Sequence, residues 1–131
     1  MLTDVDLPTH KFDIAVAQKL VDYGMPAVEP ILYGILEWFQ DYNWPVAHTL
    51  EPLFDGMGEP IVPYIQNILS GDDDLWKYWI VVVVIPKLAI SAQDLLIADI
   101  KRILDEPTEG EIREEVVLEA KEYLLRKQTI G

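Results

Sequence analysis

VEPILYGILEWF, residues 28–39, carries apolar side chains at helical spacing. Its stripe consists of Val28, Ile31, Leu32, Ile35, Leu36 and Phe39. Positions i, i+3, i+4, i+7 and i+8 share one face of an α-helix, so this stripe predicts a helix with one buried side. The pattern returns in residues 61–69 and 96–104, and a shift of 33 residues places Val28 on Ile61. Repetition at this period predicts a stack of helical hairpins.

A second type of helix is predicted between these stripes. The expected segments are Phe12 to Tyr23, Trp44 to Phe54, Leu75 to Leu88 and Ile112 to Leu125. Asn43 and Asp74 are the predicted N-caps of the second and third segments. Before the fourth, Thr108-Glu109-Gly110-Glu111 matches the capping box.

Prolines and one β-branched run modify this pattern. Pro52 and Pro86 lie inside the second and third segments, and each should kink its helix by removing a backbone hydrogen bond. The run of residues 80–85, IVVVVI, taken alone would favour a buried strand. Its place in the repeat and the cap before it favour a helix that is apolar all round.

We therefore expect an all-α fold, a short α-solenoid of HEAT-like helical hairpins with about seven helices. The expected single domain covers residues 1–131. Residues 1–8 form a lead-in, about 9–40, 43–70 and 74–105 form three hairpins, and about 109–128 form one closing helix.

Composition narrows the class of protein. Half of the 131 residues are apolar and a quarter are charged. The sequence has no cysteine, and this excludes disulfides and zinc–thiolate sites. Residues 1–6 lack the features of a secretory signal, and the apolar run 79–86 is shorter than a membrane helix. The expectation is a cytoplasmic protein with no membrane partner.

The charge is strongly one-sided. Ten basic and 23 acidic residues give a net charge of −13, and no lysine or arginine occurs between Lys19 and Lys77. Nucleic acids are therefore unlikely partners, because their phosphates require clustered basic side chains. The charge would steer a basic protein towards the chain. The alternative is that acidity only keeps the protein soluble.

Two acidic turns, each followed by tryptophan, supply the candidate partner-binding residues. These are Asp41, Asn43, Trp44, His48, Asp73, Asp74, Trp76, Lys77 and Trp79. They suit an aromatic and acidic strip that binds lysine or arginine of a partner. The competing interpretation is packing between repeats, which is favoured for Trp44 and Trp76.

Catalytic and metal chemistry has weaker support. His48 and Glu51 share one helix face, but a metal centre needs more ligands from other helices. The run Asp72-Asp73-Asp74 lacks the spacing of an EF-hand and fits a helix start. We expect no cofactor and no metal site. An enzyme or small-ligand protein with a groove around His48, Glu51, Asp41 and Lys77 stays as the alternative.

Three motifs carry a resemblance. They are DYNWPVA (41–47), DDLWKYW (73–79) and PTEGE (107–111), the last followed by Glu114-Glu115. Together they resemble a small bacterial family of unknown function with a HEAT-like fold, over about Leu7 to Leu125. The resemblance implies a helical-repeat fold and no activity. The leading hypothesis is a non-enzymatic protein-interaction module that masks a basic partner, in the manner of an inhibitor or immunity protein.

Overall fold

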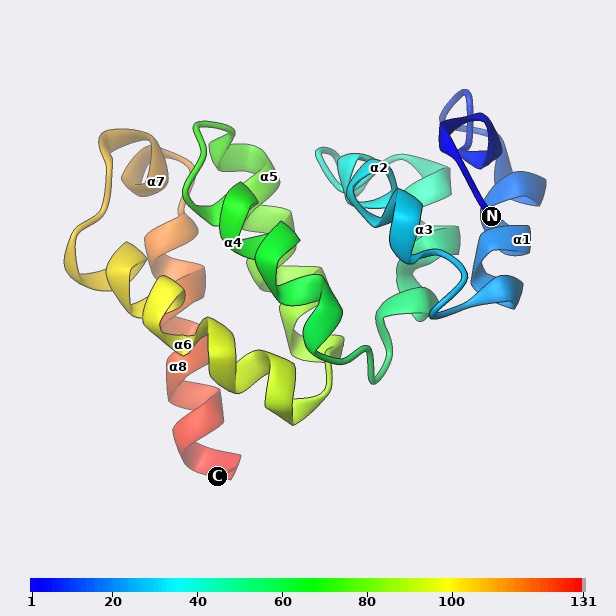
Figure 1. The fold of residues 1–131 in the computed structure, drawn as a ribbon. Helices are drawn as coiled ribbons and strands as arrows, with labels where there is room; N and C mark the ends of the chain where they lie inside the picture. The colour runs from blue at the N-terminus through cyan, green and yellow to red at the C-terminus, as the bar shows by residue number, and fades with distance from the viewer. Residues whose placement is uncertain (131) are drawn as a thin grey trace.

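The computed structural model describes the backbone of residues 1–130 and the side chains of residues 1–128. This part of the chain is all-helical, with eight α-helices and no strand (Figure 1). The α-helices are α1 (Ile14–Tyr23), α2 (Leu32–Glu37), α3 (Pro45–Leu50), α4 (Val62–Leu69), α5 (Asp74–Trp79), α6 (Ile90–Asp105), α7 (Glu109–Arg113) and α8 (Val116–Ile130). Short 3₁₀ segments are η1 (Asp4–Asp6), η2 (Glu29–Ile31), η3 (Glu51–Phe54), η4 (Glu59–Ile61) and η6 (Ile85–Lys87), and η5 (Ile80–Val84) is a π-helix. The predicted all-α class is confirmed.

The helices pack around one core that runs the length of the molecule. Helix α1 packs against α3 at the N-terminal end, and α6 packs against α4 and α8 at the other (Figure 1). Between these ends, the π-segment η5 contacts both η3 and α8. Buried apolar residues from Ala17 to Tyr123 belong to a single cluster. The buried stripes of successive helices therefore meet in one continuous core.

Two identical tripeptides begin two of the helices. Glu29-Pro30-Ile31 and Glu59-Pro60-Ile61 each fold as a 3₁₀ turn that leads directly into an α-helix. Proline is favourable there, because the first turn of a helix leaves its N–H without a partner anyway. The structure thus makes Ile31 equivalent to Ile61, which corrects the predicted match of Val28 with Ile61.

The valine-rich run is helical, as predicted. The N–H of Ile85 bonds to the carbonyl of Ile80, five residues back, and this is the bond of a π-helix. Pro86 has no N–H to give to Val82, so the backbone widens before it and then tightens into the 3₁₀ segment η6. Pro52 likewise lies where α3 gives way to the 3₁₀ segment η3. Both predicted interruptions are present.

The predicted closing helix is two helices instead of one. The capping box of Thr108 and Glu111 begins α7 as predicted. The helix stops after Arg113, because Glu115 has a positive φ of 62° that an α-helix cannot contain. The chain then restarts as α8, which gives the eighth helix.

Three predictions about helix starts are wrong. Trp44, not Asn43, is the N-cap of α3, because Asn43 lies in a turn closed by its N–H to Oδ1 of Asp41, 2.8 Å away. Asp73, not Asp74, caps α5, with Oδ1 accepting from the N–H of Trp76 at 3.0 Å. Helix α1 starts at Ile14, after Phe12.

Helix α1 ends at Gly24, whose φ of 62° suits glycine. In the predicted segment from Phe12 to Tyr23, Leu20 is buried, whereas Phe12 and Tyr23 are 61 % and 50 % exposed. None of the helices in the described part of the chain is both long and apolar enough to cross a membrane.

Candidate functional site

A buried cluster of charges lies where α5, α6 and α7 meet. The side chain of Lys77 is only 2 % exposed, and its Nζ lies 3.1 Å from Oδ1 of Asp74 and 3.0 Å from Oε2 of Glu111. Arg102 donates through Nη1 and Nη2 to the two oxygens of Glu111, at 2.6 and 2.8 Å. Nη2 of Arg102 also donates to the carbonyl of Leu69, the last residue of α4. We call Asp74, Lys77, Arg102 and Glu111 the charge cluster.

Glu111 is the centre of this charge cluster. It has no exposed surface, and every group around its carboxylate is a donor. Burial by itself would raise the pKa of Glu111, but hydrogen bonds from Arg102, from the backbone of Thr108 and from Lys77 lower it to about 2. The carboxylate is therefore ionised at neutral pH and holds two cations in place.

Gly110 shows how tightly the two motifs fit together. A Cβ at this position would overlap Oδ2 of Asp74 and lie 2.7 Å from its Cγ. The motifs DDLWKYW and PTEGE thus meet in one contact, through Asp74 and Lys77 on one side and Gly110 and Glu111 on the other. This arrangement stabilises the fold and leaves little surface for a ligand.

A second group of residues lies at the surface and has a different character. The rings of Tyr42 and His48 are 4.2 Å apart, those of Tyr42 and Trp79 are 5.4 Å apart, and those of Tyr78 and Trp79 are 4.9 Å apart. His48 is exposed, and the other three residues are partly exposed. We call Tyr42, His48, Tyr78 and Trp79 the aromatic patch. It joins the loop before α3, α3 itself and α5.

Carboxylates flank the aromatic patch at both ends. Partial burial and the neighbouring Glu51 raise the pKa of Tyr42 above its ordinary value. Partial burial and the carboxylates of Glu119 and Glu115 do the same to the pKa of Tyr78. A cation over the ring faces would be favoured by these neighbouring carboxylates.

The structure separates the predicted binding residues into two groups. Asp41, Asn43, Trp44, His48 and Trp79 lie in or near the aromatic patch, whereas Asp74, Trp76 and Lys77 face the interior. Asp73 is exposed and is occupied as the cap of α5. Asp74, Trp76 and Lys77 therefore offer little surface to a partner.

The three tryptophans among the predicted binding residues differ in their surroundings. Trp76 is 6 % exposed, its Nε1 donates to the carbonyl of Leu36 at 2.9 Å, and Tyr33 meets it edge-on. This confirms the packing interpretation for Trp76. Trp44 is half-buried and meets the ring of Trp38 edge-on at 5.5 Å. Trp79 is half-buried, and its Nε1 is enclosed without a hydrogen-bond partner among the described residues.

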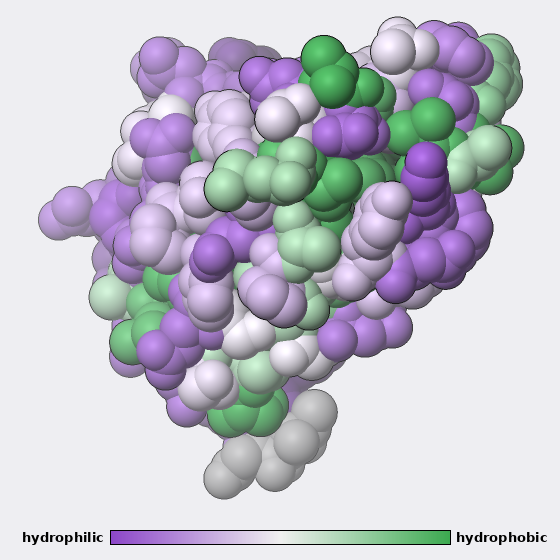
Figure 2. All heavy atoms as spheres, turned by 45° about the vertical axis from the view of Figure 1, so that its right-hand side comes forward, coloured by the Kyte–Doolittle hydropathy of each residue, from purple (hydrophilic) through white to green (hydrophobic). Residues whose placement is uncertain are grey.

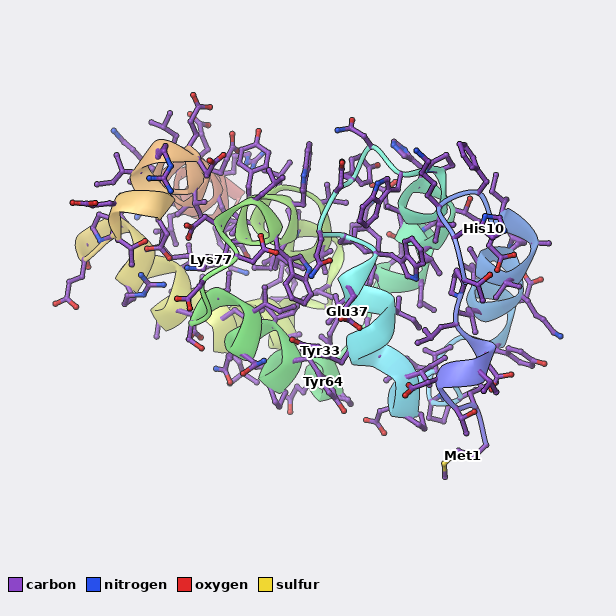
Figure 3. The ribbon with its side chains drawn as sticks, turned by 90° about the horizontal axis from the view of Figure 1, so that it is seen from above. Met1, His10, Tyr33, Glu37, Tyr64 and Lys77 are labelled. Atoms are coloured by element: carbon purple, nitrogen blue, oxygen red, sulfur yellow. The ribbon has the colours of Figure 1, made fainter. Side chains whose placement is uncertain are left out.

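Aromatic side chains also lie between α2 and α4. In the view from above, Tyr33 and Glu37 project from α2 towards α4, which carries Tyr64 (Figure 3). Lys77 is labelled on α5 in the same view, where it is directed to the charge cluster. Lys77 is therefore not beside His48, so the groove predicted around His48, Glu51, Asp41 and Lys77 does not contain Lys77.

His48 contacts Tyr42 and does not join a ligand set. No three histidine, aspartate or glutamate side chains within the described residues form a group that could hold a metal ion. Glu51 instead forms an ion pair with Lys87 at 3.6 Å.

The residues of the two groups that the sequence interpretation missed are Tyr42 and Glu111 as the partner of Lys77, and for Tyr78 it left packing and binding both open. Tyr42 stands inside a quoted motif and could have been chosen with its neighbours. Glu111 was predicted only as a cap, because no sequence signal pairs it with a lysine 34 positions away. On the face drawn in Figure 2, hydrophobic side chains appear in groups among hydrophilic ones.

Comparison with known proteins gives a family and no activity. None of the curated proteins with which the chain was compared matches it. A family model described as "Domain of unknown function (DUF5071)" matches residues 7–124, close to the extent that the three motifs predicted. The predicted membership of a family of unknown function is confirmed. The chain belongs to the DUF5071 family.

Proposed function

We propose that this protein is a non-enzymatic interaction module that binds a basic partner protein through the aromatic patch. The observation that carries the proposal is the continuous contact of Tyr78, Trp79, Tyr42 and His48, partly open to solvent and flanked by carboxylates. Aromatic faces beside acidic groups attract lysine and arginine side chains.

The partner's chemistry follows from the charge. A net charge of −13 steers a basic protein towards the molecule and repels nucleic acid. Tyrosine and tryptophan bury a large area at a small entropic cost, and for this reason they often anchor interfaces. Masking of a basic surface, in the manner of an inhibitor or immunity protein, is one form of this function.

We also propose that the hairpins form a HEAT-like stack, which would suit this role. Two observations support the stack: a Glu-Pro-Ile turn precedes both α2 and α4, and η5 contacts η3 on one side and α8 on the other. Stacked helix pairs present long surfaces made from successive repeats. The aromatic patch, which draws on α3 and α5, would be such a surface.

Affinity capture with matched variants tests the proposal. Glu119→Lys places a cation beside Tyr78 and should abolish capture of the basic partner, whereas Glu122→Lys makes the same change one turn later on α8 and should not. Retention on the wild-type protein should fall as salt rises, because exposed charges are screened. Equal capture by the two variants, or retention that salt leaves unchanged, would contradict the proposal.

A further inference from the structure

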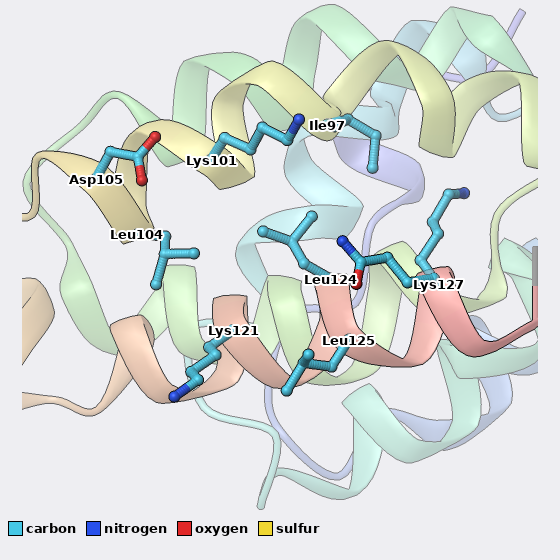
Figure 4. Close-up of a pocket in the computed structure, with 9 residues that line it drawn as sticks. Ile97, Lys101, Leu104, Asp105, Lys121, Leu124, Leu125 and Lys127 are labelled. Atoms are coloured by element: carbon cyan, nitrogen blue, oxygen red, sulfur yellow. The ribbon is translucent and has the colours of Figure 1, made fainter.

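A groove of about 610 Å³ runs between α6 and α8, at the opposite end of the molecule from α1 (Figures 1 and 4). Its lining is Ile97, Lys101, Leu104 and Asp105 from α6, with Lys121, Leu124, Leu125, Lys127 and Gln128 from α8. In the close-up, Leu104 and Leu124 lie between the two helices, and the lysines lie along the edges. The groove has an apolar floor and a basic rim.

The core covers the apolar residues of the groove only in part. Ile97 and Leu124 pack against the edge of the core and stay half-buried, and Leu104 is half-buried as well. On α8, Leu118 and Leu125 are two turns apart and are 57 % and 48 % exposed. Of these two, Leu125 lines the groove, so α8 adds one exposed apolar side chain to its floor.

The rim of the groove is unusually basic for this acidic protein. Three of its ten basic residues line one groove, where Asp105 is the single acid, although acids outnumber bases 23 to 10 in the chain. Lys127 pairs with Asp94 at 3.3 Å. Lys101 and Lys121 have no carboxylate within ion-pair distance anywhere in the described residues. Their charges are therefore available to an acidic partner.

We propose that this groove binds an acidic amphipathic helix of a partner protein. A third helix fits between two packed helices, with its apolar residues at i, i+3, i+4 and i+7 on the floor. From Ile97 to Asp105 the groove is about 12 Å long, which is about two helical turns. Glutamate or aspartate at the edges of that helix would meet Lys101 on α6 and Lys121 on α8.

Charge also argues against a second copy of this chain as the occupant. Two identical grooves would bring the lysines of one rim against the lysines of the other. This surface is distinct from the aromatic patch, so the inference does not depend on the proposed function.

The experiment uses the full chain and three synthetic peptides of about 18 residues, long enough to form a helix. The first has leucines at i, i+3, i+4 and i+7 and glutamates on its other positions. The second replaces each glutamate by lysine, and the third keeps the composition of the first but scatters the leucines. Binding is followed by amide chemical-shift changes in ¹⁵N-labelled protein. Only the first peptide should bind, with shifts confined to α6 and α8.

The double variant Lys101→Glu/Lys121→Glu should raise the Kd for the first peptide at least about tenfold, because attractive pairs become repulsive. His48→Ala, at the aromatic patch, should leave this Kd unchanged, and circular dichroism checks that both variants fold. Absence of shifts on α6 and α8 at millimolar peptide would overturn the proposal, as would equal binding of the glutamate and lysine peptides. A dimer in light scattering that Lys101→Glu/Lys121→Glu dissociates would identify a second copy as the occupant and overturn it too.

Discussion

Replacement of Glu111 by glutamine should destabilise the fold by about 3–5 kcal/mol at neutral pH, the usual effect of breaking a buried ion pair from one side. Glutamine has almost the same shape, so the change tests charge and hydrogen bonding and creates no cavity. Every group around the carboxylate is a donor, from Lys77, Arg102 and Thr108. The amide NH₂ of glutamine would therefore face a donor in either orientation.

The pH dependence gives an independent estimate of the same quantity. The pKa of Glu111 is lowered from 4.5 to about 2 in the folded protein. Because the folded pKa is the lower one, the carboxylate contributes stability above about pH 4.5, and this contribution is lost as the pH falls towards 2. The shift corresponds to about 3 kcal/mol at neutral pH, at about 1.4 kcal/mol per pKa unit.

Urea unfolding, followed by far-UV circular dichroism at several values between pH 7 and pH 3, measures both effects. The difference between wild type and Glu111→Gln should be largest at pH 7 and should shrink below about pH 4.5. Glu109→Gln is the matched control, two residues earlier in the same helix and exposed, and should cost less than about 0.5 kcal/mol. A loss below about 1 kcal/mol at pH 7, or a difference that does not change with pH, would refute this account of the charge cluster.

Three further changes are predicted from the same structure, each measured by urea unfolding at neutral pH. Gly110→Ala should cost about 1–3 kcal/mol, because the new Cβ overlaps the carboxylate of Asp74; an unchanged midpoint would show that this carboxylate moves aside easily. Trp76→Phe should cost about 1–2 kcal/mol, since it removes the Nε1 bond to the carbonyl of Leu36, and a neutral result would mean that water replaces that bond. Glu115→Gly should stabilise by up to about 1 kcal/mol, because its φ of 62° strains any side chain but suits glycine; a loss of stability would contradict that reasoning.

The periodic stripes were sufficient to predict most of the helices. Every member of the stripe from Val28 to Phe39 is at most 3 % exposed, as its spacing required. The valine-rich run is helical despite its β-branched residues, because neighbours on two sides bury it. Tertiary burial here overrides local preference. The break at Glu115 was not predictable, because an exposed glutamate carries no sequence sign of a positive φ.

The candidate site was predicted only in part, because the position of a residue in the sequence does not show whether its side chain points to the interior or to the surface. Lysine is rarely buried, so Lys77 was expected at the surface. The burial of Lys77 depends on Glu111, which lies 34 residues away. The sequence already accounts for Glu111 as part of the capping box, so nothing in it indicates a second role as the partner of Lys77. His48 contacts the ring of Tyr42, and Tyr42, which connects His48 to Trp79, was overlooked.

The motif DDLWKYW serves the interior and the surface at once. Successive residues of a helix point about 100° apart, so a helix as short as α5 can direct neighbouring side chains to different surroundings. Lys77 faces the charge cluster, whereas Tyr78 and Trp79 join the aromatic patch. The ion pairs of Lys77 therefore fix the helix that carries two of the four aromatic rings.

Because Glu111 holds Lys77, Glu111→Gln should also weaken partner capture by the aromatic patch, without altering any residue of that patch. Capture that stays at the wild-type level, in protein that is still folded, would show that the two sites are independent.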